Sequence, residues 1–361
     1  MKGSQIGIIG GGIAAAVIIA VLLVSQTGIS QDTTPLPADN DVVTPTIEPE
    51  NEVAVQSEDK LLVYTTFYPL YQFTQGVAGD AAEVRILIPS NADPHASELG
   101  PQTIAALTKA DMVIYNGADF EPYIDEIMSA SDFAHIVFVD SSEGIELMEG
   151  EAHDHHGHGS HGDDKHDDHS KEDGHDDHGE EGGIDHTYDP HIWLDPILAK
   201  AQVMTIADHL QESDPAHAEI YHDNAISYAN QLDQLDQEIR SDVSSCAKDT
   251  FVPFHNAFSY FAERYDLNTL AVIQEFSPET PVTAKDIEEL IHFAEDNDIK
   301  YFFTEENRNP KLAERLASEL GGDILLFSPL ESLSANDDPN VTYFEKMREN
   351  VDNLQIALEC N

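Results

Sequence analysis

The sequence has very few cysteines and very few basic residues. Only two of its 361 residues are cysteine, too few for a disulfide-stapled scaffold or a four-cysteine zinc site. Lysine and arginine total 17 against 69 acidic residues, so the formal net charge is −52. Such a charge repels phosphate, which argues against a nucleic-acid partner and against binding to anionic lipid headgroups. Hydrophobic residues still make up 41% of the chain, which predicts folded cores and excludes global disorder.

An apolar run stands at the N-terminus. Residues 6–24 carry no polar side chain, which approaches the ~20 residues that cross a bilayer. We therefore predict that residues 1–26 form a membrane anchor, with a cleaved signal segment as the alternative. Residues 27–59 hold eight acidic and no basic residues, a composition typical of a disordered tether. In both cases the rest of the chain is expected to lie outside the cytoplasm.

The remainder alternates strand-like and helix-like segments in two sets. This alternation predicts an α/β fold with two lobes, each containing a four-stranded, mainly parallel sheet. The first lobe is expected over residues 60–195 and the second over residues 245–361. The strands are predicted at Leu61–Thr65, Val84–Ile88, Met112–Tyr115, Ile136–Val139, Phe251–Phe254, Thr269–Ile273, Lys300–Phe303 and Asp323–Phe327.

Residues 196–244 are predicted to be linking helices. Apolar residues recur at three- and four-residue spacing from Pro215 to about Val243, which predicts one long helix. Nearly thirty helical residues span ~40 Å, enough to join and brace the two lobes as a rigid rod.

Residues 151–188 form a histidine-rich, acidic insertion with almost no apolar content, which predicts a disordered loop. Its imidazoles and carboxylates could wrap metal ions, so we expect an auxiliary metal-collecting loop. A solvated loop without a specific task is the alternative. The histidines of this loop are His153, His155, His156, His158, His161, His166, His169, His175, His178 and His186.

Three histidines outside the insertion stand at strand ends or helix starts. His95 comes after the strand Val84–Ile88, His255 follows the strand Phe251–Phe254, and His191 opens a helix beside the single tryptophan. Glu331 lies beyond the last strand. Ligands of open α/β sheets bind outside the carboxyl ends of strands, so these four side chains could form a tetrahedral metal site.

At these positions the sequence resembles a known family, the metal-binding subunits of high-affinity zinc and manganese ABC uptake transporters. The resemblance extends over about residues 60–361. The matching segments are Tyr64-Thr65-Thr66-Phe67-Tyr68-Pro69-Leu70, Asp93-Pro94-His95, Asn116-Gly117-Ala118-Asp119-Phe120-Glu121-Pro122, Asp189-Pro190-His191-Ile192-Trp193-Leu194-Asp195-Pro196, His255-Asn256-Ala257-Phe258-Ser259-Tyr260-Phe261 and Phe303-Thr304-Glu305-Glu306.

The resemblance implies a metal held between two lobes, with His95, His191 and His255 as ligands. Glu331 stands where the family usually has an aspartate, so the fourth ligand is either this glutamate or water. Manganese-type members carry a glutamate where His255 stands. Three imidazoles suit Zn²⁺, whereas Mn²⁺ prefers oxygen ligands. We therefore expect zinc, with manganese or another divalent metal as the alternative.

The expected function is metal capture outside the membrane and delivery to the permease of an ABC transporter with a separate ATPase subunit. The chain has no G-x-x-x-x-G-K-[ST] motif of its own, and we expect a monomer without enzymatic activity. A zinc hydrolase is the rival from another class, but H-E-x-x-H is absent. An adhesin or an extracellular metal buffer is the third alternative.

The two cysteines stand at the edges of the second lobe. Cys246 comes just before the strand Phe251–Phe254, and Cys360 ends the final helical segment. In an oxidising compartment a disulfide between them would pin that helix to the second lobe. Two free thiols are the alternative.

Overall fold

The computed structural model describes residues 60–89, 92, 94–95, 97–150, 188–278, 281–334 and 336–360. The predicted anchor, the tether and the ten histidines of the insertion lie outside the described residues. Among the described helices, none combines the length and the apolar character that crossing a bilayer requires.

The first lobe contains a parallel sheet in the order β2-β1-β3-β4. Val63 at the centre of β1 pairs with Val84 on one side and Met112 on the other. Strands β1 and β3 are almost completely buried, as expected where helices cover both faces of a parallel sheet. The elements in chain order are β1 (Leu62–Thr65), α1 (Tyr68–Ala78), β2 (Glu83–Ile86), α2 (Pro101–Leu107), β3 (Met112–Tyr115), α3 (Ile124–Ser129), η1 (Ser131–Phe133) and β4 (Val137–Asp140).

The second lobe repeats this order less regularly. Strands β5 and β6 form one parallel pair and β7 and β8 another, and a single bridge between Val252 and Phe302 joins the pairs. The second sheet is therefore interrupted where the sequence predicted four continuous strands. The elements of this lobe are β5 (Thr250–Phe251), α6 (Ser259–Arg264), β6 (Asn268–Thr269), α7 (Ala284–Asp296), β7 (Tyr301–Thr304), α8 (Lys311–Leu320) and β8 (Asp323–Leu326).

Pro253 explains the shortened strand β5. A proline has no N–H to donate to a neighbouring strand, so regular pairing stops before it. The chain keeps contact with the β6 side through the N–H groups of Val272 and Ile273, which donate to the carbonyls of Pro253 and Phe254. A last bridge pairs His255 with Ile273. This irregular extension carries His255 to the edge of the sheet.

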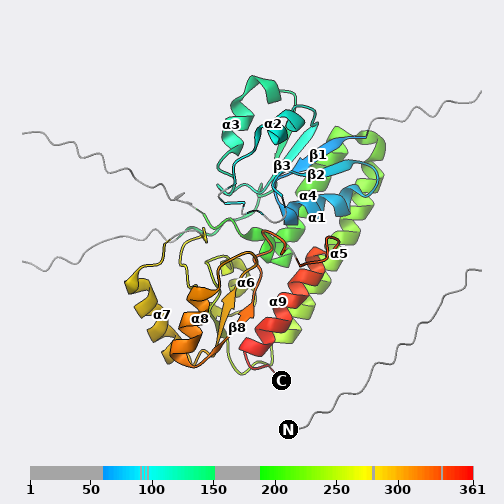
Figure 1. Ribbon diagram of the computed structural model, residues 1–361. Helices are drawn as coiled ribbons and strands as arrows, with labels where there is room; N and C mark the ends of the chain where they lie inside the picture. Colours follow the sequence, from blue (N-terminus) through cyan, green and yellow to red (C-terminus); the bar gives the residue numbers. More distant parts are fainter. Residues whose placement is uncertain are drawn as a thin grey trace, which may run out of the picture. The chain divides into compact units, whose positions relative to one another are not determined.

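Helices connect the lobes. The connection contains η2 (Ile192–Leu194), α4 (Pro196–Ser213), η3 (Pro215–His217) and α5 (Ala218–Val243), and α9 (Tyr343–Ala357) closes the chain. The predicted long helix is confirmed, although Pro215 opens a 3₁₀ turn and α5 begins three residues later. Helix α5 runs beside α9 past the second lobe (Figure 1). Its 26 residues span ~39 Å.

A continuous hydrophobic core passes through the connection. It includes Phe73 of the first lobe, Leu232 of α5, Phe303 of the second lobe and Tyr343 of α9, all fully buried. Separate apolar clusters lie under α2 and α3 in the first lobe and under α7 and α8 in the second. The shared core gives the ends of both sheets a common support.

Candidate metal centre

The four predicted ligand residues come together. His95 follows β2, His255 follows β5, Glu331 follows β8, and His191 is the residue before η2. Counting one ligand atom from each residue, all four atoms lie within 4.8 Å of one another, and all four side chains are buried. Among the described residues this is the one group of histidine, cysteine or acidic side chains with such spacing.

The carboxylate of Glu331 lies at the centre of this cluster. Its Oε1 is 3.1 Å from Nε2 of His95, 3.2 Å from Nε2 of His191 and 3.3 Å from Nε2 of His255. The Nε2 atoms of His191 and His255 are 3.3 Å apart. Nitrogen ligands at the usual distance from zinc in a tetrahedral site are separated by about 3.3 Å. Four of the six distances among these atoms therefore match those around a single tetrahedral ion, and all four atoms lie within 4.8 Å of one another.

Two further carboxylates hold the outer nitrogens of two imidazoles. Nδ1 of His191 is 2.8 Å from Oδ1 of Asp189, and Nδ1 of His255 is 2.5 Å from Oε1 of Glu305. Each carboxylate also accepts the backbone N–H of the same histidine. This arrangement places the ring proton on Nδ1 and leaves Nε2 to face the cluster, as in metal sites whose histidines are held by carboxylates.

The electrostatics of the cluster favour positive charge. Burial alone would raise the pKa of Glu331, but the imidazoles of His95 and His255 hold it well below its ordinary value. Burial alone would lower the pKa of His255, but the carboxylates of Glu305 and Glu331 raise it to about 10. Three carboxylates thus surround three imidazoles in a buried space. A cation at this point, whether a proton or a metal ion, is stabilised by all three.

Aromatic rings border the imidazoles. The ring of Phe120 lies 4.7 Å from that of His95, and the ring of Trp193 lies 5.1 Å from that of His191, measured between centroids. Phe67 packs on both Phe120 and Trp193. These apolar rings exclude water from one side of the cluster, which strengthens the electrostatic interactions inside it.

The loop that supplies Phe120 is shaped by Glu121. This buried carboxylate accepts the hydroxyl of Thr66 at 2.6 Å and the backbone N–H of Asn116 at 2.7 Å. Burial raises its pKa to about 7 although these donors stabilise the charged form. Gly117 has a φ of +81°, and a Cβ there would collide with the side chain of Asp140. Glycine is therefore required at this turn.

The loop that supplies Glu331 is clamped from two sides. Asn350 of α9 accepts the N–H of Ser328 and donates to its carbonyl, both at 2.7 Å. The indole N–H of Trp193 donates to the carbonyl of Pro329 at 2.7 Å. These partners fix the backbone before Glu331. From this fixed loop the glutamate side chain, which is longer than the aspartate usual in the family, reaches the imidazoles.

The sequence did not identify which carboxylates orient the histidines. Asp189 stands two residues before His191 in the quoted Asp-Pro-His stretch, and Glu305 follows β7 in the quoted Phe-Thr-Glu-Glu stretch. Both positions were therefore visible as motif residues. The partner of Asp189 is two residues away, whereas the partner of Glu305 depends on packing within the second lobe, because Glu305 and His255 are 50 residues apart in the chain.

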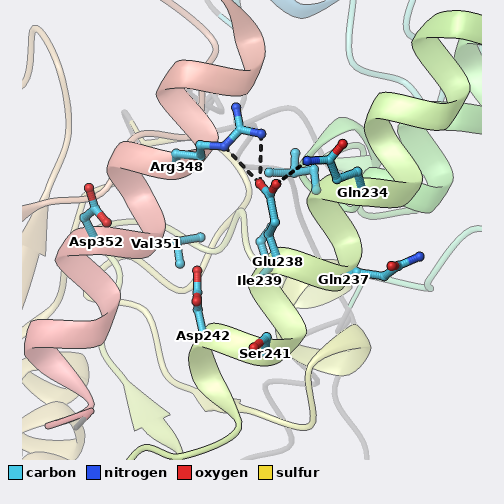
Figure 2. A pocket seen from close by; sticks show the side chains of 10 residues that line it. Gln234, Gln237, Glu238, Ile239, Ser241, Asp242, Arg348, Val351 and Asp352 are labelled. Carbon is cyan, nitrogen blue, oxygen red and sulfur yellow. Dashed lines mark hydrogen bonds and ion pairs between the residues drawn. The ribbon is translucent and has the colours of Figure 1, made fainter.

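The remaining histidines within the described residues lie outside the cluster. His217 pairs with Asp214, and His292 lies 4.0 Å from Glu295 at the surface. A separate surface groove between α5 and α9 contains Glu238 with its partners Arg348 and Gln234 (Figure 2). No residue of the four-membered cluster lines this groove. The cysteines of the second lobe, Cys246 and Cys360, are joined by a disulfide in the structure.

The family described as zinc-uptake complex component A, periplasmic, matches residues 63–357. The chain belongs to this family. The high-affinity zinc uptake system protein ZnuA of Bacillus subtilis is 35% identical over 301 residues, 83% of this chain and 88% of that protein. The zinc-binding protein AdcA of Streptococcus pyogenes is 32% identical over 84% of this chain, and the chain spans only 57% of its length.

Solved structures share the fold of this chain. The Zn(II)-bound ZnuA-like domain of Streptococcus pneumoniae AdcA is 28% identical and superimposes with a TM-score of 0.66, covering 83% of this chain and 99% of that one. The laminin-binding protein Lmb of Streptococcus agalactiae, described as having adhesin and metal transporting activity, is 27% identical with a TM-score of 0.68 and the same coverage of both chains. The predicted two-lobed α/β fold is thereby confirmed.

Proposed function

We propose that this protein captures Zn²⁺ outside the cytoplasm and delivers it to the permease of an ABC uptake system. The observation that carries the proposal is the buried cluster of His95, His191, His255 and Glu331, with ligand atoms within 4.8 Å of one another. Membership of the component A family supports the transport role. Such a subunit needs a permease and an ATPase as partners.

The proposed ligands are the three Nε2 atoms and the central Oε1 of Glu331. Three nitrogens and one oxygen in a compact set suit zinc, whereas manganese prefers more oxygen ligands. The position of Oε1, within 3.3 Å of each imidazole, favours Glu331 over water as the fourth ligand. The cargo ion would replace protons in neutralising the three carboxylates around the site.

Metal analysis under chelator competition tests this assignment. We expect the wild type to retain one tightly bound zinc, and His95→Ala and His255→Ala each to lose it. His135→Ala is the matched control, because His135 is exposed and lies outside the cluster. Full zinc retention in both cluster variants would overturn the site. Cobalt, nickel and manganese offered at equal concentration test the preference for zinc.

Zinc uptake by cells tests the transport role separately from binding. Cells that lack the protein should take up zinc poorly from chelator-limited medium, and the wild-type gene should restore uptake. The His255→Ala gene should fail to do so. We propose that residues 1–26 hold the protein at the outer face of the membrane, which a fractionation of the same cells measures.

We further propose that the histidine-rich segment collects zinc for the main site. The proposal rests on its sequence, ten histidines among acidic residues. Glu149 and Tyr188 pair in an antiparallel bridge at its two ends, so deletion of residues 151–187 with a short glycine linker should preserve the fold. Calorimetry should find fewer weak zinc sites in the deletion variant and an unchanged tight site. Unchanged total stoichiometry would contradict the collecting role.

A further inference from the structure

The backbone before His191 is held from both lobes. Asn116, in the loop after β3, donates through Nδ2 to the carbonyl of Pro190 at 2.8 Å. Tyr260, in α6 of the second lobe, donates its hydroxyl to the carbonyl of Asp189, also at 2.8 Å. Two consecutive carbonyls are therefore fixed by side chains from opposite lobes. The position of His191 depends on both.

The hydroxyl of Tyr260 has a second partner. It accepts the backbone N–H of Met148 at 2.9 Å, and the N–H of Asp189 donates to the carbonyl of Met148 at 2.9 Å. Tyr260 is 3% exposed, and its hydrogen bond to Asp189 is buried. The three residues form a closed ring of hydrogen bonds in which the phenol oxygen joins two backbone segments.

This ring leads directly to the imidazoles. The side chain of Asp189, whose backbone Tyr260 fixes, holds both the N–H and Nδ1 of His191 at 2.9 and 2.8 Å. Tyr260 itself lies five residues after His255, at the second position of α6. One side chain thus connects the segment that carries His255 to the residue that orients His191.

We propose that Tyr260 is a positioning residue that sets the spacing between the imidazoles of His191 and His255 and thereby the affinity for zinc. The inference deepens the proposed zinc site and depends on it. None of the three residues of the ring is a proposed ligand: Tyr260 acts through Asp189. Without the hydroxyl, the carbonyl of Asp189 and the N–H of Met148 lose their shared partner, and the 3.3 Å separation of the two Nε2 atoms is no longer enforced.

The variant Tyr260→Phe removes only the hydroxyl. We expect its zinc affinity, measured by chelator competition on the full chain, to fall about fivefold, somewhat less than when a direct partner of a ligand is lost. The visible spectrum of the Co²⁺-loaded protein should change, because the ligand geometry relaxes. Tyr221→Phe is the matched control: it also removes a buried hydroxyl, here bonded to Asp214 at 2.8 Å on the connecting helices. We expect it to lower the melting temperature with zinc affinity unchanged.

A double-mutant cycle separates positioning from general destabilisation. In an Asp189→Ala background the Tyr260→Phe change should lower zinc affinity by a smaller factor than in the wild type, because the route through the Asp189 side chain is gone and only the backbone of residue 189 still links Tyr260 to His191. Equal fold-losses in both backgrounds, or wild-type affinity in Tyr260→Phe, would overturn the inference. If His95→Ala and His255→Ala keep their tight zinc, the proposed site itself fails. If they lose it and Tyr260→Phe does not, only the role of Tyr260 fails.

Discussion

The first lobe pairs its four strands along consecutive residues, whereas the second lobe divides the same order into two pairs joined by one bridge. The less regular lobe supplies more of the candidate site. His255, its partner Glu305 and the central Glu331 all follow strands of the second lobe, while the first lobe supplies His95. Pro253, two residues before His255, prevents β5 from continuing as a regular strand to that histidine.

This difference indicates how the second lobe is stabilised. A sheet with fewer regular hydrogen bonds needs other restraints, and the second lobe has them. The disulfide joins the segment before β5 to the residues that follow α9, and beside it the N–H of Lys248 donates to the carbonyl of Leu358. Asn350 of α9 clamps the loop before Glu331. Contacts with α9 and with the residues after it therefore restrain the second lobe where regular strand pairing is missing.

Removal of the disulfide should cause the largest loss of stability, and the loss should be greater in the second lobe than in the first. The bond closes a loop with a sequence separation of 114, so the double change Cys246→Ser with Cys360→Ser should lower the free energy of unfolding by about 2–4 kcal/mol. Denaturant unfolding measures the loss. Amide hydrogen exchange should accelerate more in β5–β8 than in β1–β4. Equal acceleration in both lobes would contradict a local restraint and point to one cooperative unit.

The buried carboxylate of Glu121 makes the first lobe sensitive to pH. Its pKa rises from an ordinary 4.5 to about 7 because burial disfavours the charged form. The folded protein then holds a proton that the unfolded chain has released, so the stability from this group is complete below pH 4.5 and is lost as pH rises through 7. Between pH 5 and 8 the loss is about 2 kcal/mol.

The variant Glu121→Gln tests this because its amide cannot titrate. We expect the stability difference between the variant and the wild type to shift in favour of the variant by about 2 kcal/mol from pH 5 to pH 8. Glu314→Gln, an exposed change on α8, serves as control and should show no such shift. A pH-independent difference for Glu121→Gln would mean that the carboxyl titrates normally.

Removal of the charge on Glu305 should lower zinc affinity more than it lowers the stability of the fold. The change Glu305→Gln retains an oxygen that can accept from Nδ1 of His255 but removes the charge, so zinc affinity should fall about tenfold. The matched change at the connecting segment is Asp189→Asn, which alters the partner of His191 in the same way. If zinc affinity falls in Glu305→Gln alone, the second lobe controls the affinity. If it falls in neither variant, these two carboxylates do not contribute to zinc binding.

The sequence predicted the parts of the site that depend on the order of strands and helices along the chain. Histidines at strand ends were visible because parallel strands alternate with helices, and Glu331 was visible from its place after the last strand. The buried face of α5, with Tyr221, Leu232 and Leu235, follows from three- and four-residue spacing alone. Helix α1 shows the same spacing in Leu70, Phe73 and Val77, and Pro69 is tolerated because it lies in the first turn.

What the sequence could not supply are contacts between distant segments. The partnership of Glu305 with His255 depends on how β5 and β7 lie together, and Trp193 reaches Pro329 across 136 residues of chain. Such pairings are decided by the tertiary arrangement, for which local propensity carries no information. The interruption of the second sheet is different, because Pro253 lies inside the predicted strand Phe251–Phe254 and its missing N–H was visible in the sequence.

The smallest expected effect on zinc affinity concerns the bond between the connecting segment and the second lobe. Trp193→Phe retains a ring beside His191 but loses the N–H that donates to Pro329 and leaves a gap where the buried indole was, so stability should fall by about 2–3 kcal/mol. The loop before Glu331 then keeps only its clamp from Asn350, and we expect about a threefold loss of zinc affinity. Tyr343→Phe is the control, because its hydroxyl bonds the carbonyl of Trp193 and leaves the Pro329 contact intact. It should lower stability by about 1 kcal/mol, the contribution of one hydrogen bond, with zinc affinity unchanged. If both variants bind zinc as the wild type does, the second lobe fixes Glu331 without help from the connection.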